Sequence, residues 1–394
     1  MIVAGLMSGT SVDGVDITLV EITGKGPRLR TRLLGHRGYP YSPSLRQRIL
    51  AVAECGSVGE VCHLHALLGE VFASAIIKTA RTCRIPLKKI ALIGSHGQTV
   101  YHRPRPVREP GVGLVRSTLQ IGDPNIIAER TGVTTVSDFR SRDMAAGGEG
   151  APLAPYGHAV VFTRRKVNRL VLNLGGIANV TVLPGNGVWS QIRAFDTGPC
   201  NMLLDGLMSL ESKGGKRMDR GGRQASRGTV NEKLAEWMLA HPYFSQLPPK
   251  STGREMFGMS YVQQVLKRGR RQKLSFVDIL ATSCRCIAQV IGDAQQWISQ
   301  PVQEVVAGGG GVRNACLWRE LESRFAPVSL KTMEACGSHS TAFEAQAFAI
   351  LAYQHIQGVC GNLPSVTGAR HPVVLGTVSP GHNHPVRLLS DAKL

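Results

Sequence analysis

The sequence predicts an α/β protein built from two related domains, and three observations carry this prediction. Residues 2–4 and 17–22 have the length and β-branched content of strands and enclose a glycine-rich turn. The same succession of strand, glycine turn and strand recurs at residues 170–183. A chain of 394 residues is also longer than one hydrophobic core usually supports, since domains run to about 100–200 residues.

The recurrence sets the expected domain boundaries. We place the first domain at residues 1–135 and the second, which carries the repeated unit, at residues 136–359. The turn-rich tail at about 360–394 is expected to complete the first domain, with residues 373–376 returning as an edge strand. Two facing domains of this kind would place both glycine turns on the walls of one cleft.

Composition limits the classes of protein to consider. Apolar residues make up 43% of the chain, but no run of about 18 apolar residues spans a bilayer and no basic leader precedes the first apolar run. The 9 cysteines form no zinc pattern, which favours reduced thiols. The net charge is +19, yet aromatic residues make up only 5%, too few for base stacking. We therefore expect a cytoplasmic protein that binds neither membrane nor nucleic acid, with a solvated basic surface.

The opening turn has the composition of a phosphate-binding loop. It comprises Gly9, Thr10, Ser11, Val12, Asp13, Gly14, Val15 and Asp16. Glycine permits positive φ and close backbone approach, and backbone N–H groups and hydroxyls can then converge on phosphate oxygens. Asp13 and Asp16 stand where a Mg²⁺ ion that bridges phosphates needs oxygen ligands. The alternative is a glycine-rich hairpin with solvated aspartates.

The rest of the first domain alternates helices and strands. One helix begins after Ser42 with proline at its first position, and a second begins at the capping box of residues 57–60. A buried strand at 89–93 is expected to end in the polar loop 94–99, which contains His96. Open α/β sheets bind ligands at the carboxyl ends of their strands, so His96 is a candidate substrate contact.

A charged segment follows a short helix and a strand at 134–136. Residues 138–153 combine aspartates, a glutamate and arginines with three glycines. This mixture suits a hydroxyl-rich sugar, and Arg142 and Asp143 are the candidate contacts.

Two glycine loops mark the second domain. The first contains Gly175 and Gly176, followed by Asn179, and the second runs through Gly308, Gly309 and Gly310 to Asn314. Asn314 is expected to cap a helix at 315–325, so this loop fits an adenosine or phosphate contact at a helix N-terminus.

Asp196 is the candidate catalytic carboxylate. It ends a strand and is followed by Thr-Gly-Pro, which makes a stiff turn. Phosphoryl transfer to a neutral acceptor needs one carboxylate to take a proton, while positioning and charge neutralisation supply the rest. The alternative is an aspartate that caps the next helix. Further along, residues 248–257 offer lysine and arginine to phosphate, to an acidic sugar or to solvent, and helices are expected at 231–239, 275–297 and 338–353.

Seven motifs together carry a family resemblance: MSGTSVDGVD, GSHGQT, DFRSRDMAAGGEGAPL, LNLGGIANV, FDTGPCN, PPKSTGRE and GGGGVRN. In order and spacing they resemble those of the anhydro-N-acetylmuramic acid kinases. That resemblance implies the actin, sugar kinase and Hsp70-like ATPase fold, with two RNase H-like domains around a nucleotide cleft, and a homodimer. Cys200 stands where the family usually has glycine, and residues 336–343 also depart from its pattern.

The resemblance also implies a reaction. Water would attack the anomeric carbon and open the 1,6-anhydro bridge, while O6 takes the γ-phosphoryl group of ATP, with Mg²⁺, to give N-acetylmuramic acid 6-phosphate. The implied roles are water activation for Asp196, nucleotide binding for residues 9–16 and sugar contact for Glu344. The alternatives are a levoglucosan-type kinase, a non-kinase ATP-binding switch of the Hsp70-like kind and, less favoured, nucleic-acid binding through the basic runs.

Overall fold

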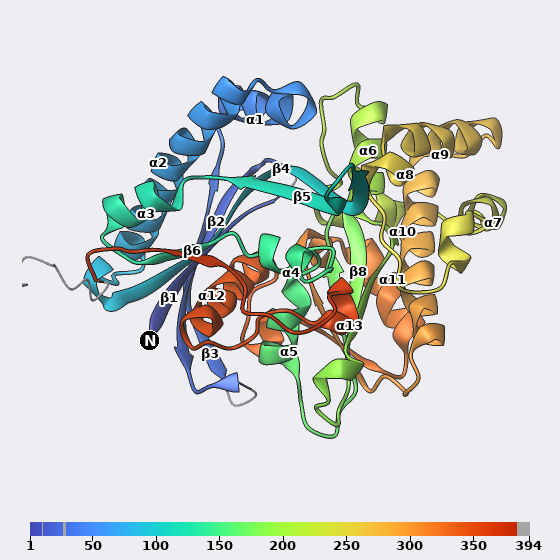
Figure 1. Ribbon diagram of the computed structural model, residues 1–394. Helices are drawn as coiled ribbons and strands as arrows, with labels where there is room; N and C mark the ends of the chain where they lie inside the picture. Colours follow the sequence, from blue (N-terminus) through green and yellow to red (C-terminus); the bar gives the residue numbers. More distant parts are fainter. Residues whose placement is uncertain (10, 27–28, 384–394) are drawn as a thin grey trace, which may run out of the picture. The chain divides into compact units, whose positions relative to one another are not determined.

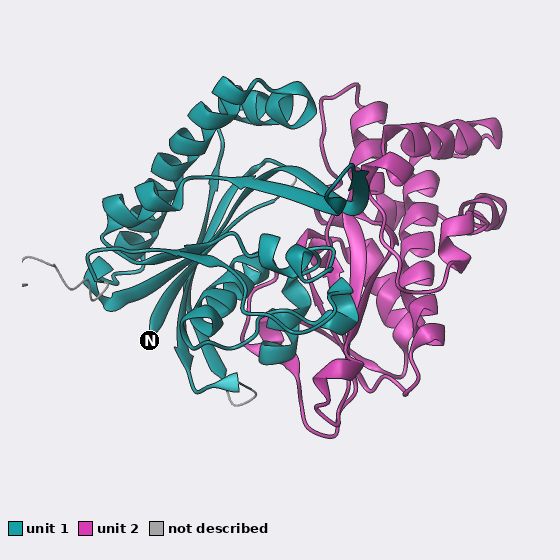
Figure 2. Cartoon of the chain, viewed as in Figure 1, with its two compact units in different colours: residues 1–161, 342–394 teal, residues 162–341 magenta. Residues whose placement is uncertain are grey.

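The computed structural model describes residues 1–9, 11–26 and 29–383, so Thr10 of the predicted phosphate loop lies outside the described residues. The chain divides into two compact units (Figures 1 and 2). Unit 1 runs from Met1 to Val161 and resumes at Ala342, and unit 2 is Phe162–Thr341. The first unit thus continues beyond residue 135, where the sequence placed the boundary, and it includes residues 342–359, which the sequence assigned to the second domain.

Unit 1 is a mixed sheet with helices on it. Its strands are β1 (Ile2–Ser8), β2 (Gly14–Thr23), β3 (Arg30–Pro40), β4 (Ile90–Glu109), β5 (Gly113–Ile121), β6 (Thr135–Ser137) and β12 (Thr377–Ser379). Its helices are α1 (Pro43–Cys55), α2 (Val58–Thr82), α3 (Pro124–Thr131), α4 (Ser141–Ala145), α5 (Ala154–Phe162), α12 (Phe343–Ile356) and α13 (Pro364–Thr367). The strand order is β12-β6-β4-β1-β2-β3, with β5 paired to β4.

Unit 2 repeats the central part of this topology. Its strands are β7 (Arg169–Leu174), β8 (Ile177–Leu183), β9 (Arg193–Pro199), β10 (Glu304–Gly308) and β11 (Ser329–Thr332), in the order β11-β10-β7-β8-β9. In each unit the first three strands form an antiparallel meander. The fourth strand then pairs in parallel with the first, and a further strand pairs in parallel with the fourth. The shared order confirms the predicted duplication and the RNase H-like fold class.

The helices of unit 2 are α6 (Asn201–Glu211), α7 (Glu232–Leu239), α8 (Arg254–Phe257), α9 (Met259–Arg271), α10 (Phe276–Asp293) and α11 (Ala315–Phe325). Apolar residues of β7–β10 pack with α6, α9, α10 and α11 in one buried core. Unit 2 therefore has a complete sheet and a core of its own.

In unit 1, successive residues of β1 face two different helices in alternation. Ala4 and Leu6 join the core that contains Leu64 and Phe72 of α2. Gly5 faces the other way, toward α12, where a Cβ atom would lie 1.8 Å from the Ala345 carbonyl oxygen. Because successive strand residues point to opposite faces, α2 and α12 cover opposite sides of the sheet. Glycine lets α12 lie directly against the strands.

The helix caps agree with the sequence. Ser42, Ser57 and Asn314 each accept a hydrogen bond from the first turn of the helix that follows. Such caps satisfy backbone N–H groups that have no partner within the helix.

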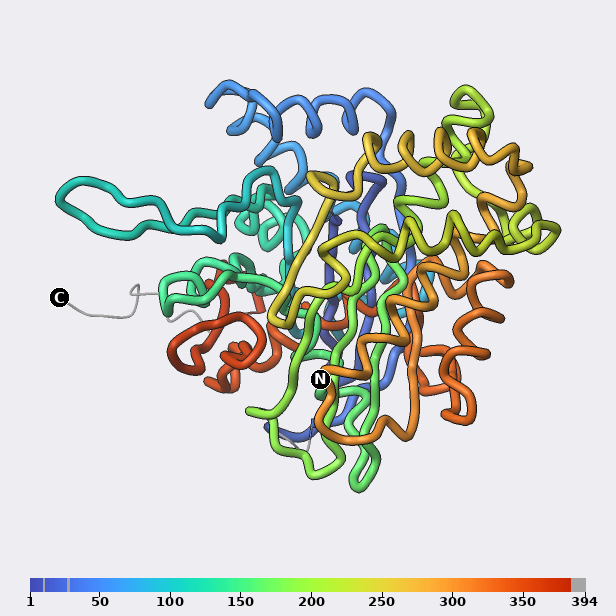
Figure 3. Tube along the Cα trace, turned by 90° about the vertical axis from the view of Figure 1, so that its right-hand side faces the viewer, coloured from blue at the N-terminus to red at the C-terminus, as the bar shows by residue number. Residues whose placement is uncertain are grey.

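Two expectations about the elements of unit 1 were wrong. Residues 94–99 are not a loop, because β4 continues through them to Glu109 and forms a hairpin with β5 that projects from the unit (Figure 3). The edge strand expected at residues 373–376 lies instead at β12, Thr377–Ser379. Helix α2 is long and apolar enough to cross a membrane by length and composition alone. Its residues Leu64, Leu68, Phe72 and Ile76 are packed in the core of unit 1, and a core helix passes the same test.

Candidate functional site

Buried polar side chains hold the glycine turn of unit 1 in place. The Ser8 hydroxyl lies 2.7 Å from the Tyr41 hydroxyl and 2.6 Å from Oε1 of Gln98. Nε2 of Gln98 donates to the Gly9 carbonyl at 3.3 Å. Gln98 belongs to residues 94–99, which were expected to form a ligand-binding loop. These residues lie within β4, and Gln98 supports the predicted phosphate turn from there. Among the described residues, the group that a Cβ atom at Gly9 would approach most closely is the Ser11 hydroxyl, at 3.9 Å, so the backbone there is not crowded by them.

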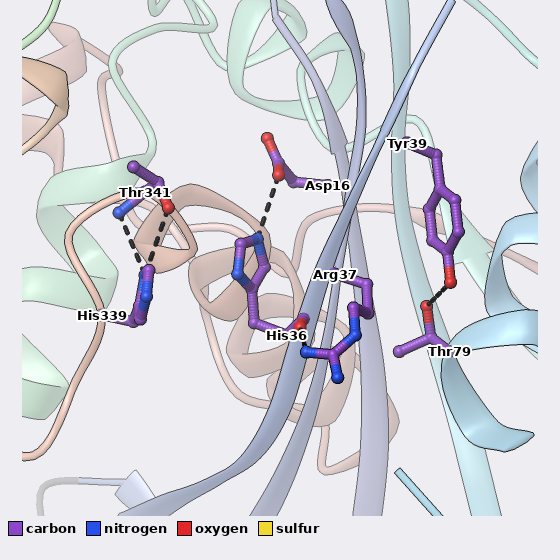
Figure 4. A network of polar contacts seen from close by, with 7 residues as sticks. All are labelled: Asp16, His36, Arg37, Tyr39, Thr79, His339 and Thr341. Atoms are coloured by element: carbon purple, nitrogen blue, oxygen red, sulfur yellow. Dashed lines mark hydrogen bonds and ion pairs between the residues drawn. The ribbon is translucent and has the colours of Figure 1, made fainter. Parts of the chain in front are cut away.

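The two aspartates of this turn have different surroundings. The Asp13 side chain is 76% exposed and lies 3.8 Å from Arg46. Asp16 belongs to β2 and lies 3.0 Å from Nε2 of His36 on β3 (Figure 4). Among the described residues no group of three side chains is arranged to hold a metal ion by protein ligands alone. Mg²⁺ usually keeps several waters and needs only one or two carboxylates beside substrate phosphates, so both aspartates fit that use.

A histidine, an arginine and a glutamate form a second cluster in unit 1. His96 is buried, and its Nδ1 lies 2.8 Å from the Gly97 carbonyl, to which it donates. Its Nε2 then accepts from Arg140, at 3.0 Å from Nε and 2.8 Å from Nη2. Burial, aided by Arg140, lowers the pKa of His96 well below its ordinary value, so the ring is neutral at physiological pH.

Glu344 completes this cluster at the first turn of α12. Glu344 is exposed, but its neighbours partly desolvate the carboxyl and so raise its pKa. Arg140 opposes this shift, and the charge of Asp16 raises the pKa further. Desolvation lowers the pKa of Arg140 to about 10, and Glu344 and Asp143 oppose this. His96, Arg140, Glu344 and Asp16 are thus close enough to influence one another.

Arg142 and Asp143, the predicted sugar contacts of this segment, have surroundings that differ from those of Arg140. Arg142 is exposed, and the arginine that reaches His96 is Arg140. Asp143 is fully buried and accepts hydrogen bonds from Gly150 N, Asn362 Nδ2 and the Thr367 hydroxyl. Its carboxylate therefore holds the segment together. Sequence reasoning missed Arg140 because two arginines and two aspartates stand within six residues, and only the fold distinguishes them.

Asp196 is anchored within unit 2 by backbone and side-chain contacts. Its Oδ2 accepts from Thr252 N at 3.0 Å, its own N–H donates to the Lys250 carbonyl at 3.1 Å, and its carbonyl accepts from the Tyr243 hydroxyl at 2.9 Å. Burial raises the pKa of Asp196 to about 6, the Thr252 N–H lowers it, and the charge of Glu255 adds to the rise. Asp196 is not a helix cap, because it lies inside β9 and α6 begins at Asn201.

A row of polar side chains leads to Asp196 across the sheet. Asn173 on β7 pairs with Asn179 on β8, and Asn179 pairs with Asp196 on β9. Residues directly opposite one another in antiparallel strands share a face, so the three lie side by side. The sequence placed Asn179 with the nucleotide, whereas the sheet register places it beside the candidate base. Asn173 was not among the residues predicted from the sequence. A signal for it was present, because it is a polar residue that interrupts the apolar strand before Gly175.

The second glycine loop of unit 2, at residues 308–314, borders a cavity of about 490 Å³. Its lining includes Asn201 and Asp205 of α6, Arg220, Gly310 and Asn314. Among the described residues, a Cβ atom at Gly310 or Gly176 would come no closer than 3.5 Å to a neighbour, so a ligand can approach the backbone there. Gly308 and Gly309 differ, because Cβ atoms on them would lie within 2.7 Å of Met333 and of Leu174. These two glycines allow close packing, and Gly310 is the one that faces the cavity.

Comparison with known proteins agrees with these features. Residues 1–381 match the family model described as anhydro-N-acetylmuramic acid kinase. Curated proteins of that name from Caldanaerobacter subterraneus, Trichormus variabilis and Salinibacter ruber are 43%, 42% and 42% identical, and each alignment covers 96% of this chain and 96–97% of the relative. Among solved structures, the activator of the 2-hydroxyisocaproyl-CoA dehydratase from Clostridium difficile aligns over 91% of this chain with a TM-score of 0.45 and 12% identity, too distant to bear on the site.

Proposed function

The chain belongs to the anhydro-N-acetylmuramic acid kinase family, and from that premise we propose that it opens the 1,6-anhydro ring of anhydro-N-acetylmuramic acid and phosphorylates O6 at the expense of ATP. Water adds to the anomeric carbon and the bond from that carbon to O6 breaks. O6 forms a bond to the γ-phosphorus, and ADP leaves. The products are N-acetylmuramic acid 6-phosphate and ADP.

The environment of Asp196 is the observation that carries this proposal. A general base works best when its pKa lies near the working pH, because it must be ionised and still attract a proton. A pKa of about 6 meets both conditions, and the Thr252 N–H holds one of the two carboxylate oxygens, Oδ2. We assign to Asp196 the removal of a proton from the attacking water.

The cluster of unit 1 supplies suitable contacts for the sugar. The carboxyl of Glu344 can exchange hydrogen bonds with hydroxyl or acetamido groups. Both ring nitrogens of buried His96 are already bonded, to Gly97 and Arg140, so His96 would support the sugar site by holding Arg140. The overall positive charge suits a substrate that carries a carboxylate.

The nucleotide is assigned to the glycine loops. Gly9 and the turn that follows it would hold phosphate groups, while Gly310 and Asn314 border a cavity that suits an adenosine moiety. Asp13 and Asp16 would hold Mg²⁺, which neutralises phosphate charge when it is bound. We further propose a cytoplasmic homodimer, for which light scattering would give about twice the chain mass of 42.4 kDa.

A coupled ADP assay against a panel of sugars tests the proposal. Anhydro-N-acetylmuramic acid should give sugar-dependent ADP release, whereas levoglucosan and reducing sugars should give far less. In ¹⁸O-labelled water the label should enter the anomeric hydroxyl and not the phosphate. ADP release without sugar, with label in phosphate, would instead favour a non-kinase ATP-binding switch, and preferred turnover of levoglucosan would favour the other kinase.

A further inference from the structure

Lys250 is a buried lysine that forms no ion pair in the described part of the chain. Only 8% of its surface is exposed, and the ion pairs among the described residues do not include it. Its ammonium lies over two aromatic rings, 4.1 Å from the centroid of Trp297 and 4.8 Å from that of Tyr243. It also donates to the carbonyl oxygens of Tyr243 at 3.2 Å and Phe244 at 3.3 Å. Burying a charge costs free energy, and these rings and carbonyl oxygens are the groups that compensate the buried ammonium.

The contacts of Lys250 close a ring around Asp196. The Asp196 N–H donates to the Lys250 carbonyl, the Lys250 ammonium donates to the Tyr243 carbonyl, and the Tyr243 hydroxyl donates to the Asp196 carbonyl. Trp297, which covers the ammonium, packs edge-on against Phe195 at 5.8 Å. The lysine is therefore connected to the backbone of Asp196 on both sides.

Building on the role proposed for Asp196, we propose that Lys250 is a positioning residue that holds the 250–252 segment against β9 so that the Thr252 N–H meets the Asp196 carboxylate. The aromatic rings and carbonyl oxygens hold the ammonium of Lys250 in place, and the ammonium in turn holds residues 250–252. Thr252, at the end of this segment, then donates its N–H to the Asp196 carboxylate. Lys250 touches no reacting atom.

This role has a consequence for the pH dependence of catalysis. The groups that act on the Asp196 carboxyl from the packed elements of unit 2 are the Thr252 N–H, which lowers its pKa, and Glu255, which raises it, and Tyr243 and Lys250 adjoin it. If the segment loosens while the site remains buried, the lowering contribution is lost. The pKa of Asp196 then rises, and a larger part of the enzyme is protonated and inactive at mildly acidic pH.

The variant Lys250→Met tests this directly, because methionine fills the aromatic cage without a charge or a donor. We expect the acid limb of the profile of log(kcat/KM) for the sugar to move upward by about half to one pH unit. We also expect a loss in kcat of about 10- to 100-fold, typical of a displaced catalytic group. The KM for ATP should change little. Lys233→Met, which removes an exposed lysine of α7, is the control and should match the wild type.

A purely structural role would lower the amount of folded enzyme and leave the acid limb where it is. A folded Lys250→Met variant with an unmoved limb therefore overturns the proposal. If that variant does not fold, Lys250→Arg decides, because arginine keeps the cation on the rings but cannot reproduce both ammonium contacts. It should move the limb by a smaller amount, and an unmoved limb in folded Lys250→Arg likewise overturns it. Wild-type enzyme without an acid limb, or Asp196→Asn with full activity, would instead refute the proposed function.

Discussion

At the scale of single residues, the buried environment of Asp196 suits the general base proposed there but lowers the stability of the fold at neutral pH. Burial raises the pKa of its carboxyl from 3.8 to about 6. Between these values the folded state holds a proton that the unfolded state has lost. The contribution of this carboxyl to the free energy of unfolding is therefore greatest below about pH 4 and is lost as the pH rises through 6.

The variant Asp196→Asn should separate the two effects. We expect it to bind ATP and to lose about 10²- to 10⁴-fold or more in turnover, since a general base is removed. At pH 8 it should be more stable than the wild type by about 1–3 kcal/mol, because no buried charge remains. Denaturant melts at pH 8 and pH 4 check this, and the gain should shrink at pH 4. Wild-type turnover would remove Asp196 from its proposed role.

Arg140 and Arg142 form a natural pair for a second test. Arg140 is joined to His96 and to the Gly150 carbonyl, whereas Arg142 is exposed. Arg140→Met should reduce kcat/KM for the sugar by about 10- to 100-fold, because a buried polar group loses its partner and the imidazole its orientation. Arg142→Met should stay within about twofold of the wild type. Equal losses of kcat/KM in both variants would show that Arg142 also contacts the sugar.

At the scale of elements, the close approach of α12 to the sheet determines where Glu344 lies. This contact depends on glycines in two strands. A Cβ atom at Gly94 of β4 would lie 2.2 Å from the Phe348 carbonyl oxygen and 2.8 Å from Cβ of Ala352. Neither contact can relax through a flexible side chain, so a larger residue must move the helix.

Gly94→Ala should therefore destabilise the protein by about 1–3 kcal/mol and raise the KM for the sugar, because Glu344 shifts with its helix. Gly59→Ala is the matched control, since no group in the described part of the chain lies within 4 Å of a Cβ at that position of α2. It should be neutral or stabilise the fold by about 0.5–1 kcal/mol. Thermal melts and sugar kinetics on both variants would show the difference. If the two alanines behaved alike, the close approach of α12 would not determine stability.

Local signals in the sequence identified many elements but not the long strand β4. The caps at Ser42, Ser57 and Asn314 were predictable because capping depends on neighbouring residues. The polar residues 94–99 suggested a loop because their partners lie far away in sequence. Gln98 bonds to Ser8, and His96 to Arg140, so the polar groups of a buried strand are satisfied by tertiary contacts. In the same way, the pairing of Asn179 with Asp196 depends on a strand register that spacing alone does not give.

At the scale of the whole molecule, the two units have one topology but different chain paths. Unit 2 is continuous in sequence and contains its own five-stranded sheet and core. Unit 1 is interrupted, and α12 and β12, which follow unit 2 in the chain, pack on and pair with its strands. The repeated glycine turn could be recognised in the sequence because it is local, whereas the return of α12 to the first unit could not.

This difference predicts how the separated units behave. Residues 162–341 expressed alone should fold, because their apolar face is covered within the fragment. Residues 1–161 alone should not, since Gly5 and Gly94 then face water where α12 belongs. Dispersed amide resonances and a cooperative melt would identify the folded fragment. The cavity beside Gly310 lies entirely within residues 162–341, so ATP should still perturb resonances of this fragment, with weaker affinity than in the full chain. A disordered 162–341 fragment, or a folded 1–161 fragment, would show that the units do not fold independently in this way.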